Sequence, residues 1–271
     1  MGSHQSERAK YALILGSSSG FGAATAIRLA QDGFHIFGVH LDRKATMPQV
    51  EAIMEQIKRQ GVQAIFFNVN AADDEKRKMV VKEIKGQLPV GAYIDVMLHS
   101  LAFGALKPFI ADEPSQAINK ASMAMTMDVM AHSLVYWTQE LYWAGLLGAG
   151  SRIFAMTSSG SKVVFPHYGA VSAAKAALEN HVKQLGMELG HLGVTVNAIM
   201  AGVTDTPALR KIPGHEKMIA MAKQRNAGGR LTTPEDVAKV ISLLARPEAQ
   251  WINGGVIPVD GGELVMDKGE V

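Results

Sequence analysis

The strongest constraint on the fold is the regular alternation of short, apolar, β-rich runs with longer amphipathic segments. Seven runs occur, at residues 11–15, 34–41, 63–69, 94–99, 151–156, 193–200 and 256–259. Helical periodicity marks the segments between them, at residues 21–32, 48–60, 74–86, 115–145, 168–190 and 233–245. Apolar strands that alternate with helices are typical of a parallel sheet covered on both faces. The pattern predicts an α/β fold with a doubly wound, seven-stranded parallel sheet.

Nothing in the pattern divides residues 9–271 into two domains, because no linker, repeat or low-complexity tract interrupts them. We expect a single catalytic domain. Residues 203–229 are the one long stretch of weak pattern, and we expect a substrate loop or lid there, with an ordinary surface connection as the alternative. Residues 1–8 contain Gly-Ser-His, which is typical of an expression-tag remnant, and are expected to be disordered.

The composition excludes several classes of function. The 271 residues include 27 Lys and Arg against 25 Asp and Glu, so the net charge of +2 gives no general attraction for nucleic acid. The absence of Cys excludes disulfides, thiolate metal sites and cysteine catalysis. No apolar run is long enough to span a membrane, and no signal-peptide pattern opens the chain. We expect a soluble, cytoplasmic protein without nucleic-acid or membrane partners and without a metal site.

A glycine-rich turn follows the first predicted strand and opens the first predicted helix. Small residues at such a turn let a diphosphate approach backbone N–H groups at the positive end of the helix. The spacing therefore predicts a dinucleotide site. Its residues are Gly16, Ser18, Ser19, Gly20, Phe21 and Gly22.

The spacing of these three glycines resembles that of the short-chain dehydrogenase/reductase family, and further landmarks of the family follow in order. They are Asn68-Val69, Ser158-Ser159, Asn197-Ala198 with Gly202 and Thr204, and Val259-Asp260-Gly261-Gly262. The resemblance covers nearly the whole chain and implies a Rossmann-type fold that binds a nicotinamide dinucleotide. It implies cofactor contacts from His40, Leu41, Asn68, Val69, Ser100, Leu101, Ala102, Gly202, Val203, Thr204 and Thr206. Capping of the next turn is the alternative role for the two threonines.

The end of the second predicted strand bears on the choice between NADH and NADPH. A carboxylate such as Asp42 would favour NAD, whereas Arg43 and Lys44 would favour the 2′-phosphate of NADP. In the family the discriminating acid usually occupies the position of His40, and NADPH-preferring relatives often carry a basic residue at the position of Ser19. Arg43 and Lys44 favour NADPH, with NADH as the alternative. A second alternative is that both side chains lie on a solvated turn and contact no cofactor.

Tyr168 and Lys175 carry the predicted chemistry. Lys175 follows Tyr168 by seven positions in a predicted helix, so both side chains leave one helix face two turns apart. The commonest family pattern, Tyr-x-x-x-Lys, would place Val171 at the tyrosine position, and Met130 stands in place of the usual helix Asn. Tyr-x₆-Lys is instead the spacing of the enoyl-acyl-carrier-protein reductases of this family. The segment His99-Ser100-Leu101-Ala102-Phe103 also resembles theirs.

This resemblance implies reduction of the 2,3-double bond of a trans-2-enoyl thioester on acyl carrier protein or coenzyme A, as in fatty acid synthesis. Charge then develops on a thioester oxygen two carbons from the carbon that accepts hydride, so the donor must stand farther from the nicotinamide than in carbonyl reduction. Tyr168 would stabilise the enolate and Lys175 would hold the nicotinamide ribose. Ser158, where many of these reductases carry a second Tyr, is a further catalytic candidate. Substrate contacts are expected from Phe103, Tyr168, Ala201 and Leu209.

Two other functions stay open on the sequence alone. A carbonyl or hydroxysteroid reductase could have moved its acid to Tyr168 and kept Ser158. A protein that senses NADP(H) without turnover would need neither Tyr168 nor Lys175, which argues against it.

The predicted assembly is a homotetramer, implied by the family and by apolar residues on more than one side of helices 115–145 and 168–190. These helices would pair across one dyad, and helix 233–245 with the last strand across another. The alternative is that residues 203–229 or the chain ends of the same subunit cover these apolar helix surfaces. The methionines Met123, Met125, Met127 and Met130 are expected to pack along the interface helix 115–145, with a ligand surface as the alternative. His99 is expected to make a structural hydrogen bond.

Overall fold

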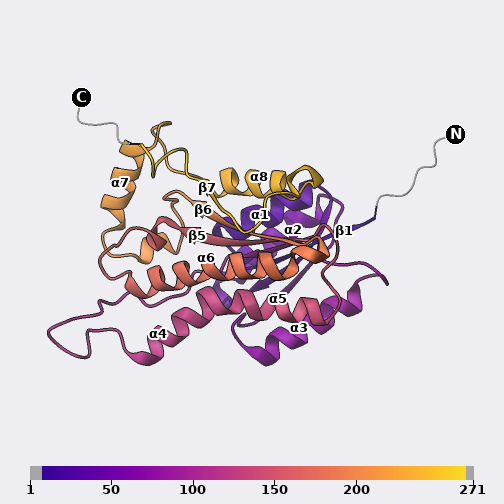
Figure 1. The fold of residues 1–271 in the computed structure, drawn as a ribbon, viewed down its shortest axis with the longest axis horizontal. Coiled ribbons are helices and arrows are strands. Elements are labelled where there is room, and N and C mark those ends of the chain that lie inside the picture. The colour runs from indigo at the N-terminus through magenta and orange to yellow at the C-terminus, as the bar shows by residue number, and fades with distance from the viewer. Residues whose placement is uncertain (1–7, 267–271) are drawn as a thin grey trace.

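Seven parallel strands form one sheet in the computed structural model, which describes residues 8–266 (Figure 1). The strands lie in the order β3-β2-β1-β4-β5-β6-β7. They are β1 Lys10–Leu15, β2 Phe34–His40, β3 Ala64–Asn68, β4 Val96–His99, β5 Arg152–Ser158, β6 Thr195–Ala201 and β7 Val256–Val259. This sheet confirms the predicted doubly wound α/β fold. The predicted tag remnant lies, except for Arg8, outside the described residues.

Helices cover both faces of the sheet (Figure 1). One face carries α1 Gly20–Gln31, α2 Met47–Lys58 and α8 Pro234–Leu244, and their apolar sides form one core with the strands. The other face carries α3 Asp74–Gln87, α4 Lys120–Met127, α5 Ser133–Trp143 and α6 Gly169–Leu189. Within residues 8–266, no helix is both long and apolar enough to cross a membrane.

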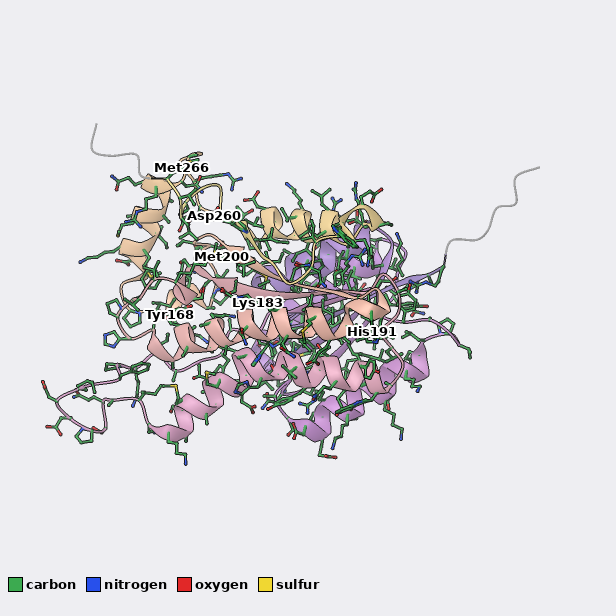
Figure 2. All side chains as sticks on the ribbon, viewed as in Figure 1. Tyr168, Lys183, His191, Met200, Asp260 and Met266 are labelled. Carbon is green, nitrogen blue, oxygen red and sulfur yellow. The ribbon has the colours of Figure 1, made fainter. Side chains whose placement is uncertain are left out.

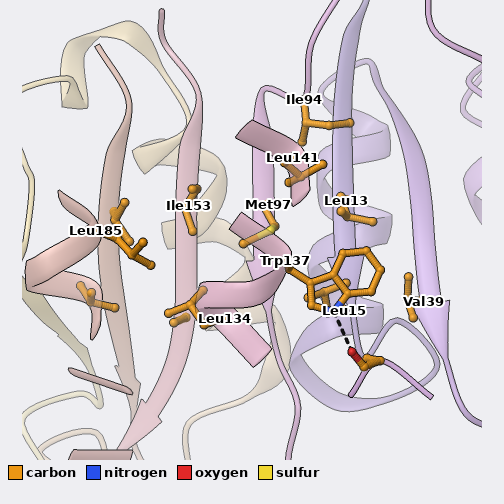
Figure 3. Packing of buried hydrophobic residues seen from close by; sticks show 14 of the residues in the cluster. Leu13, Leu15, Val39, Ile94, Met97, Leu134, Trp137, Leu141, Ile153 and Leu185 are labelled. Atoms are coloured by element: carbon orange, nitrogen blue, oxygen red, sulfur yellow. Dashed lines mark hydrogen bonds between the residues drawn. The ribbon is translucent and has the colours of Figure 1, made fainter. Parts of the chain in front are cut away.

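The core between the sheet and helices α3, α5 and α6 is anchored by Trp137 (Figure 3). This side chain is fully buried, and its Nε1 donates a hydrogen bond of 2.8 Å to the Ala71 carbonyl. Leu13, Leu15 and Met97 of the central strands belong to the same cluster. Because the indole N–H is satisfied, the large ring is buried without a polar penalty. The cluster fixes α5 and α6 against the sheet.

The predicted helix 115–145 differs from the structure at its start and in its middle. It begins at Lys120, because the Asn119 side chain caps it by accepting a 2.8 Å bond from the Ser122 N–H. A π-helical turn, Asp128–His132, separates α4 from α5. Such turns widen a helix locally and are frequent at functional sites.

The predicted substrate loop 203–229 contains two helical elements that the sequence pattern did not predict. A 3₁₀ turn spans Leu209–Lys211, and helix α7 spans His215–Arg225. Ala222 is the one residue of α7 that is fully buried. A helix with so small a buried side shows almost no apolar periodicity in its sequence.

The crevice of the fold lies where the strand order changes direction, between β1 and β4. Ligands bind at such a point, outside the carboxyl ends of the strands. Gly16 follows β1 there with φ of +89°. A Cβ at this position would lie 2.3 Å from the Ser100 carbonyl oxygen beyond β4, so only glycine fits.

Candidate active site

Two adjacent cavities open at the carboxyl ends of the strands. One of about 230 Å³ contains Tyr168 and Lys175, and one of about 400 Å³ lies beside the glycine-rich turn. Both are lined by Phe21, Ser100–Phe103 and Thr206, so they form one continuous site. Figure 2 shows Tyr168 at the end of α6 that is opposite to His191, which places the chemistry at one end of the sheet.

The cavity of about 400 Å³ presents the positive end of α1. Gly16, Ser18, Ser19 and Gly20 line it, and Ser19 is the N-cap residue of α1 but makes no side-chain capping bond. No acidic residue lies in the first turn. The N–H groups of this turn therefore remain available to an anion such as a diphosphate.

Most of the predicted cofactor residues line the two cavities. Around the turn and the neighbouring strands these are Gly16, Ser18, Ser19, Gly20, Phe21, His40, Leu41, Val69, Ser100, Leu101 and Ala102. Lys175, Gly202, Val203, Thr204 and Thr206 line the part nearer Tyr168. Gly22, Arg43 and Asn68 do not line either cavity. Gly22 instead allows α1 to pack closely, since a Cβ there would lie 2.0 Å from the Gly16 carbonyl oxygen.

The carboxyl ends of β2 and β3 form a hydrogen-bonded group with Asp42, in the loop after β2. His40 Nδ1 lies 2.9 Å from the Asp42 carboxylate, and Asn68 pairs with the Asp42 backbone through two bonds of 3.0 Å. Partial burial acts to raise the pKa of Asp42. Hydrogen bonds from Ser18, Thr46 and His40 outweigh it and lower this pKa below its ordinary value. Asn68 therefore shapes the loop after β2 through Asp42 without lining the cavities.

Tyr168 stands at the start of α6 against Ser158. Burial raises the pKa of Tyr168, while a hydrogen bond with Ser158 acts in the opposite direction. A Cβ on Gly160 would lie 2.5 Å from Cε1 of the Tyr168 ring. Phe165 meets the ring edge-on, with 6.0 Å between ring centroids. The sequence reasoning did not identify Gly160 or Phe165, although both shape the space in which Tyr168 lies.

Lys175 lies two turns into α6 and is buried. Its Nζ donates a 2.6 Å hydrogen bond to the Met156 carbonyl of β5. Burial lowers the pKa of Lys175 to about 8, against an opposing effect from Glu179. The ammonium form is therefore present at neutral pH, beside Tyr168 in the same cavity.

His99 makes the expected structural hydrogen bond. Its Nε2 lies 2.7 Å from Ser133 Oγ, and that hydroxyl donates its own proton to the Val129 carbonyl. His99 must therefore donate from Nε2, which assigns the neutral tautomer. Burial, with the nearby charge of Lys175, lowers its pKa to about 3. Across residues 8–266, no group of three or more His, Asp or Glu side chains is arranged to hold a metal ion.

Apolar side chains form most of the wall near Tyr168. The predicted substrate residues Phe103, Ala201 and Leu209 are among them. Met130 lies there too, on the π-helical turn, and Met125 lines the neighbouring cavity. The wall also includes Leu106, Met156, Val171, Ile212 and Met218, to which the sequence reasoning assigned no contact with substrate. The space beside Tyr168 suits an apolar chain.

The segment after β6 is held by a buried carboxylate that the sequence reasoning missed. Glu263 accepts a 3.0 Å bond from the Val203 N–H, and burial raises the pKa of Glu263. Thr204 donates to the Gly202 carbonyl, and Thr206 accepts from the Leu209 N–H. The alternative capping role thus describes the Thr206 hydroxyl, although both threonines also line the cavity.

Comparison with known proteins identifies similar chains of similar length. The family model described as Enoyl-(Acyl carrier protein) reductase matches residues 16–263. The uncharacterized oxidoreductase YjdA of Bacillus subtilis is 28% identical over 96% of this chain and 98% of its own. An NADPH-dependent aldehyde reductase-like chloroplastic protein of Arabidopsis thaliana is 28% identical over 93% of each chain. The crystal structure of an enoyl-[acyl-carrier-protein] reductase (NADH) from Aquifex aeolicus has a TM-score of 0.82 and 25% identity, covering 97% of this chain and 98% of its own.

Proposed function

Because this chain belongs to the short-chain dehydrogenase/reductase family of oxidoreductases, we propose that it reduces the 2,3-double bond of trans-2-enoyl thioesters with NADPH. The observation that carries the proposal is the placement of Tyr168 and Lys175 in one cavity, two turns apart on α6. Val171, where the commoner spacing would put the tyrosine, is buried and has no proton to donate. The similar Aquifex aeolicus enzyme is named as an enoyl-[acyl-carrier-protein] reductase, with NADH as its cofactor.

The residues beside the glycine-rich turn fit a dinucleotide. The uncapped first turn of α1 offers N–H groups to the diphosphate, and positions 16 and 20 have positive φ. When bound, NADPH supplies the hydride of the reaction. Lys175 would hold its nicotinamide ribose, and the backbone after Gly202 would contact its carboxamide.

The chain's own groups would then act on the thioester. The Tyr168 hydroxyl would donate to the carbonyl oxygen that gains negative charge, and Ser158 would orient that hydroxyl. The ammonium of Lys175 would add positive potential to the same region. The apolar wall would hold the acyl chain and exclude water, which strengthens each of these interactions.

NADPH is proposed on the strength of Arg43 and Lys44. Both side chains are exposed, and neither pairs with an acid in the part of the chain from 8 to 266. The carboxylate of Asp42 is already engaged by His40. Replacing Arg43 with Ala should raise the KM for NADPH several-fold and leave the KM for NADH nearly unchanged, as steady-state assays with both cofactors would measure. Equal effects on both cofactors would remove Arg43 from the 2′-phosphate site.

A carbonyl or hydroxysteroid reductase is the second candidate, and the Ser158–Tyr168 pair favours it, since a serine beside the tyrosine can also polarise a ketone. The Arabidopsis thaliana relative is named for aldehyde reduction. Oxidation of NADPH should be assayed with crotonyl thioesters of coenzyme A and acyl carrier protein beside ketones, aldehydes and hydroxysteroids. Turnover of the thioesters alone supports the proposal, whereas turnover of carbonyls alone supports the second candidate. Tight NADPH binding without any turnover would indicate a sensor.

A further inference from the structure

Lys175 has a charged neighbour that the proposed reaction does not use. Glu179 follows it by one helical turn on α6, so the two side chains leave the same face of the helix. Residues spaced in this way have Cβ atoms about 5–6 Å apart. The carboxylate favours the ammonium form of Lys175, against the burial that lowers its pKa to about 8.

The Glu179 carboxylate is held in place from the sheet. Its Oε1 accepts a 2.7 Å hydrogen bond from Thr157 Oγ1, and Thr157 is buried on β5. Glu179 itself is half-buried. A fixed carboxylate in this setting acts more strongly on its neighbours than one that moves freely in water.

Three consecutive residues of β5 contact three ionisable groups of the α6 segment. The Met156 carbonyl accepts from Lys175, the Thr157 hydroxyl donates to Glu179, and the Ser158 hydroxyl pairs with Tyr168. The carboxyl end of β5 therefore fixes the positions of Tyr168, Lys175 and Glu179 relative to one another.

Among the ionisable groups around Lys175, only Glu179 favours its ammonium form. His99 at the end of β4 lies near Lys175 but stays neutral, and Tyr168 shares the cavity. The elements packed against α6 carry six more acidic or basic side chains, and none of these is among the causes that shift the pKa of Lys175. They are Lys120, Asp128, His132, Glu140, Arg152 and His191.

We propose that Glu179, held by Thr157, is a positioning residue that keeps the Lys175 ammonium charged and directed at the cofactor. The inference rests on the proposed function only in assigning Lys175 to the cofactor ribose. It does not depend on whether the substrate is a thioester or a ketone.

The test is the pH dependence of cofactor binding in the full-length protein. Replacing Glu179 with Gln removes the negative charge and keeps an oxygen for Thr157. The pKa of Lys175 should then fall, so the ammonium is lost at lower pH. We expect the alkaline limb of NADPH binding, measured by fluorescence titration from pH 7 to 10, to move down by roughly one pH unit. At pH 9 this corresponds to a dissociation constant raised by up to about tenfold.

Matched variants separate this effect from a structural one. Titrations in the Tyr168→Phe background remove the phenol, which can also titrate in this cavity. Glu188→Gln changes an exposed carboxylate farther along α6 and should leave the limb in place. Thr157→Val keeps the Glu179 carboxylate but removes the hydrogen bond that holds it. This variant should move the alkaline limb of NADPH binding by less than Glu179→Gln does. A Glu179→Gln profile that overlays the parent, or an equal shift in Glu188→Gln, would overturn the proposal. Because binding is measured without substrate, failure of the enoyl assignment would leave this result unaffected.

Discussion

At the scale of single residues, the protonation state of Tyr168 is central to the proposed chemistry. Burial raises its pKa and the Ser158 hydrogen bond opposes this only in part, so the phenol keeps its proton at neutral pH and can donate it. His167, immediately before it, has φ of +62°, which is unusual for a residue with a side chain. A strained residue beside a reactive group is a common way of fixing its direction.

Replacing Tyr168 with Phe should lower turnover by roughly 10² or more, the size expected from losing one donor to a developing oxyanion. The dissociation constant for NADPH should change little, because the ring and Lys175 remain. Steady-state assays and fluorescence titration would measure the two quantities. Tyr142→Phe, a change at the far end of α5, is the control. Near-normal turnover in the Tyr168 variant would make Ser158 the candidate donor.

Gly160 leaves the space that the Tyr168 ring occupies. A methyl group there would lie 2.5 Å from the ring and 3.2 Å from Ser158 Oγ, so the ring must move. We expect Gly160→Ala to reduce turnover at least tenfold while the protein stays folded, because a small displacement of a catalytic group costs much of its effect. Gly86→Ala, where a Cβ meets nothing within 4 Å, provides the comparison. Equal activity in the two variants would contradict this role.

At the scale of elements, helix α8 begins where the sequence predicts. Thr233 accepts a bond from the Asp236 N–H, and the Asp236 carboxylate accepts one from the Thr233 N–H, which forms a capping box ahead of Pro234. Arg230 also hydrogen-bonds the Asp236 carboxylate, and this interaction is the largest cause of a pKa lowered to about 2.

Thr233→Ala should lower the free energy of unfolding by about 1 kcal/mol, the usual value for a lost N-cap. The folded-state pKa of Asp236 is depressed, so the stability it contributes is present above about pH 4 and is lost as the pH falls towards 2. The loss of unfolding free energy caused by Thr233→Ala should therefore be the same at pH 5 and pH 7. Urea unfolding curves at the two pH values would measure it, and a cost that disappears at pH 5 would contradict the assignment.

Helix α7 and the π-helical turn show why some elements were not predicted. Only Ala222 of α7 is fully buried, so its sequence lacks the apolar repeat that marks a helix. The π-helical turn adds a residue to a helix whose apolar repeat continues on both sides. Strands β5 and β6 are buried and consist mostly of apolar residues, which made them recognisable in the sequence.

At the scale of the whole molecule, contiguous motifs were easier to predict than pairs from distant segments. Tyr168 and Lys175 lie on one helix, and their spacing alone placed them in one cavity. Glu263 and Val203 are 60 positions apart, and only the folded chain brings them together. The same is true of Thr157 and Glu179. Charged side chains of this kind look like surface residues until their partners are known.

We propose a homotetramer, which would cover apolar side chains that one subunit leaves exposed at two places. Trp143 and Met187 are exposed on α5 and α6, and Trp251 and Val265 are exposed near α8 and β7. Leu134, Trp137, Leu178 and Leu185, by contrast, are buried within one subunit. Light scattering at micromolar concentration should give a mass near four times 29.0 kDa. A stable, active monomer would contradict the assembly.

The most direct test of the central claim follows the hydride itself. NADPH deuterated at the transferred position of the nicotinamide should be incubated with a trans-2-enoyl thioester and with a ketone, and the products examined by mass spectrometry and NMR. The account predicts a saturated thioester that carries deuterium at C3, with little label in any alcohol, and loss of that product in the Tyr168→Phe variant. Deuterium on the carbinol carbon of an alcohol, with the enoyl thioester unchanged, would contradict it.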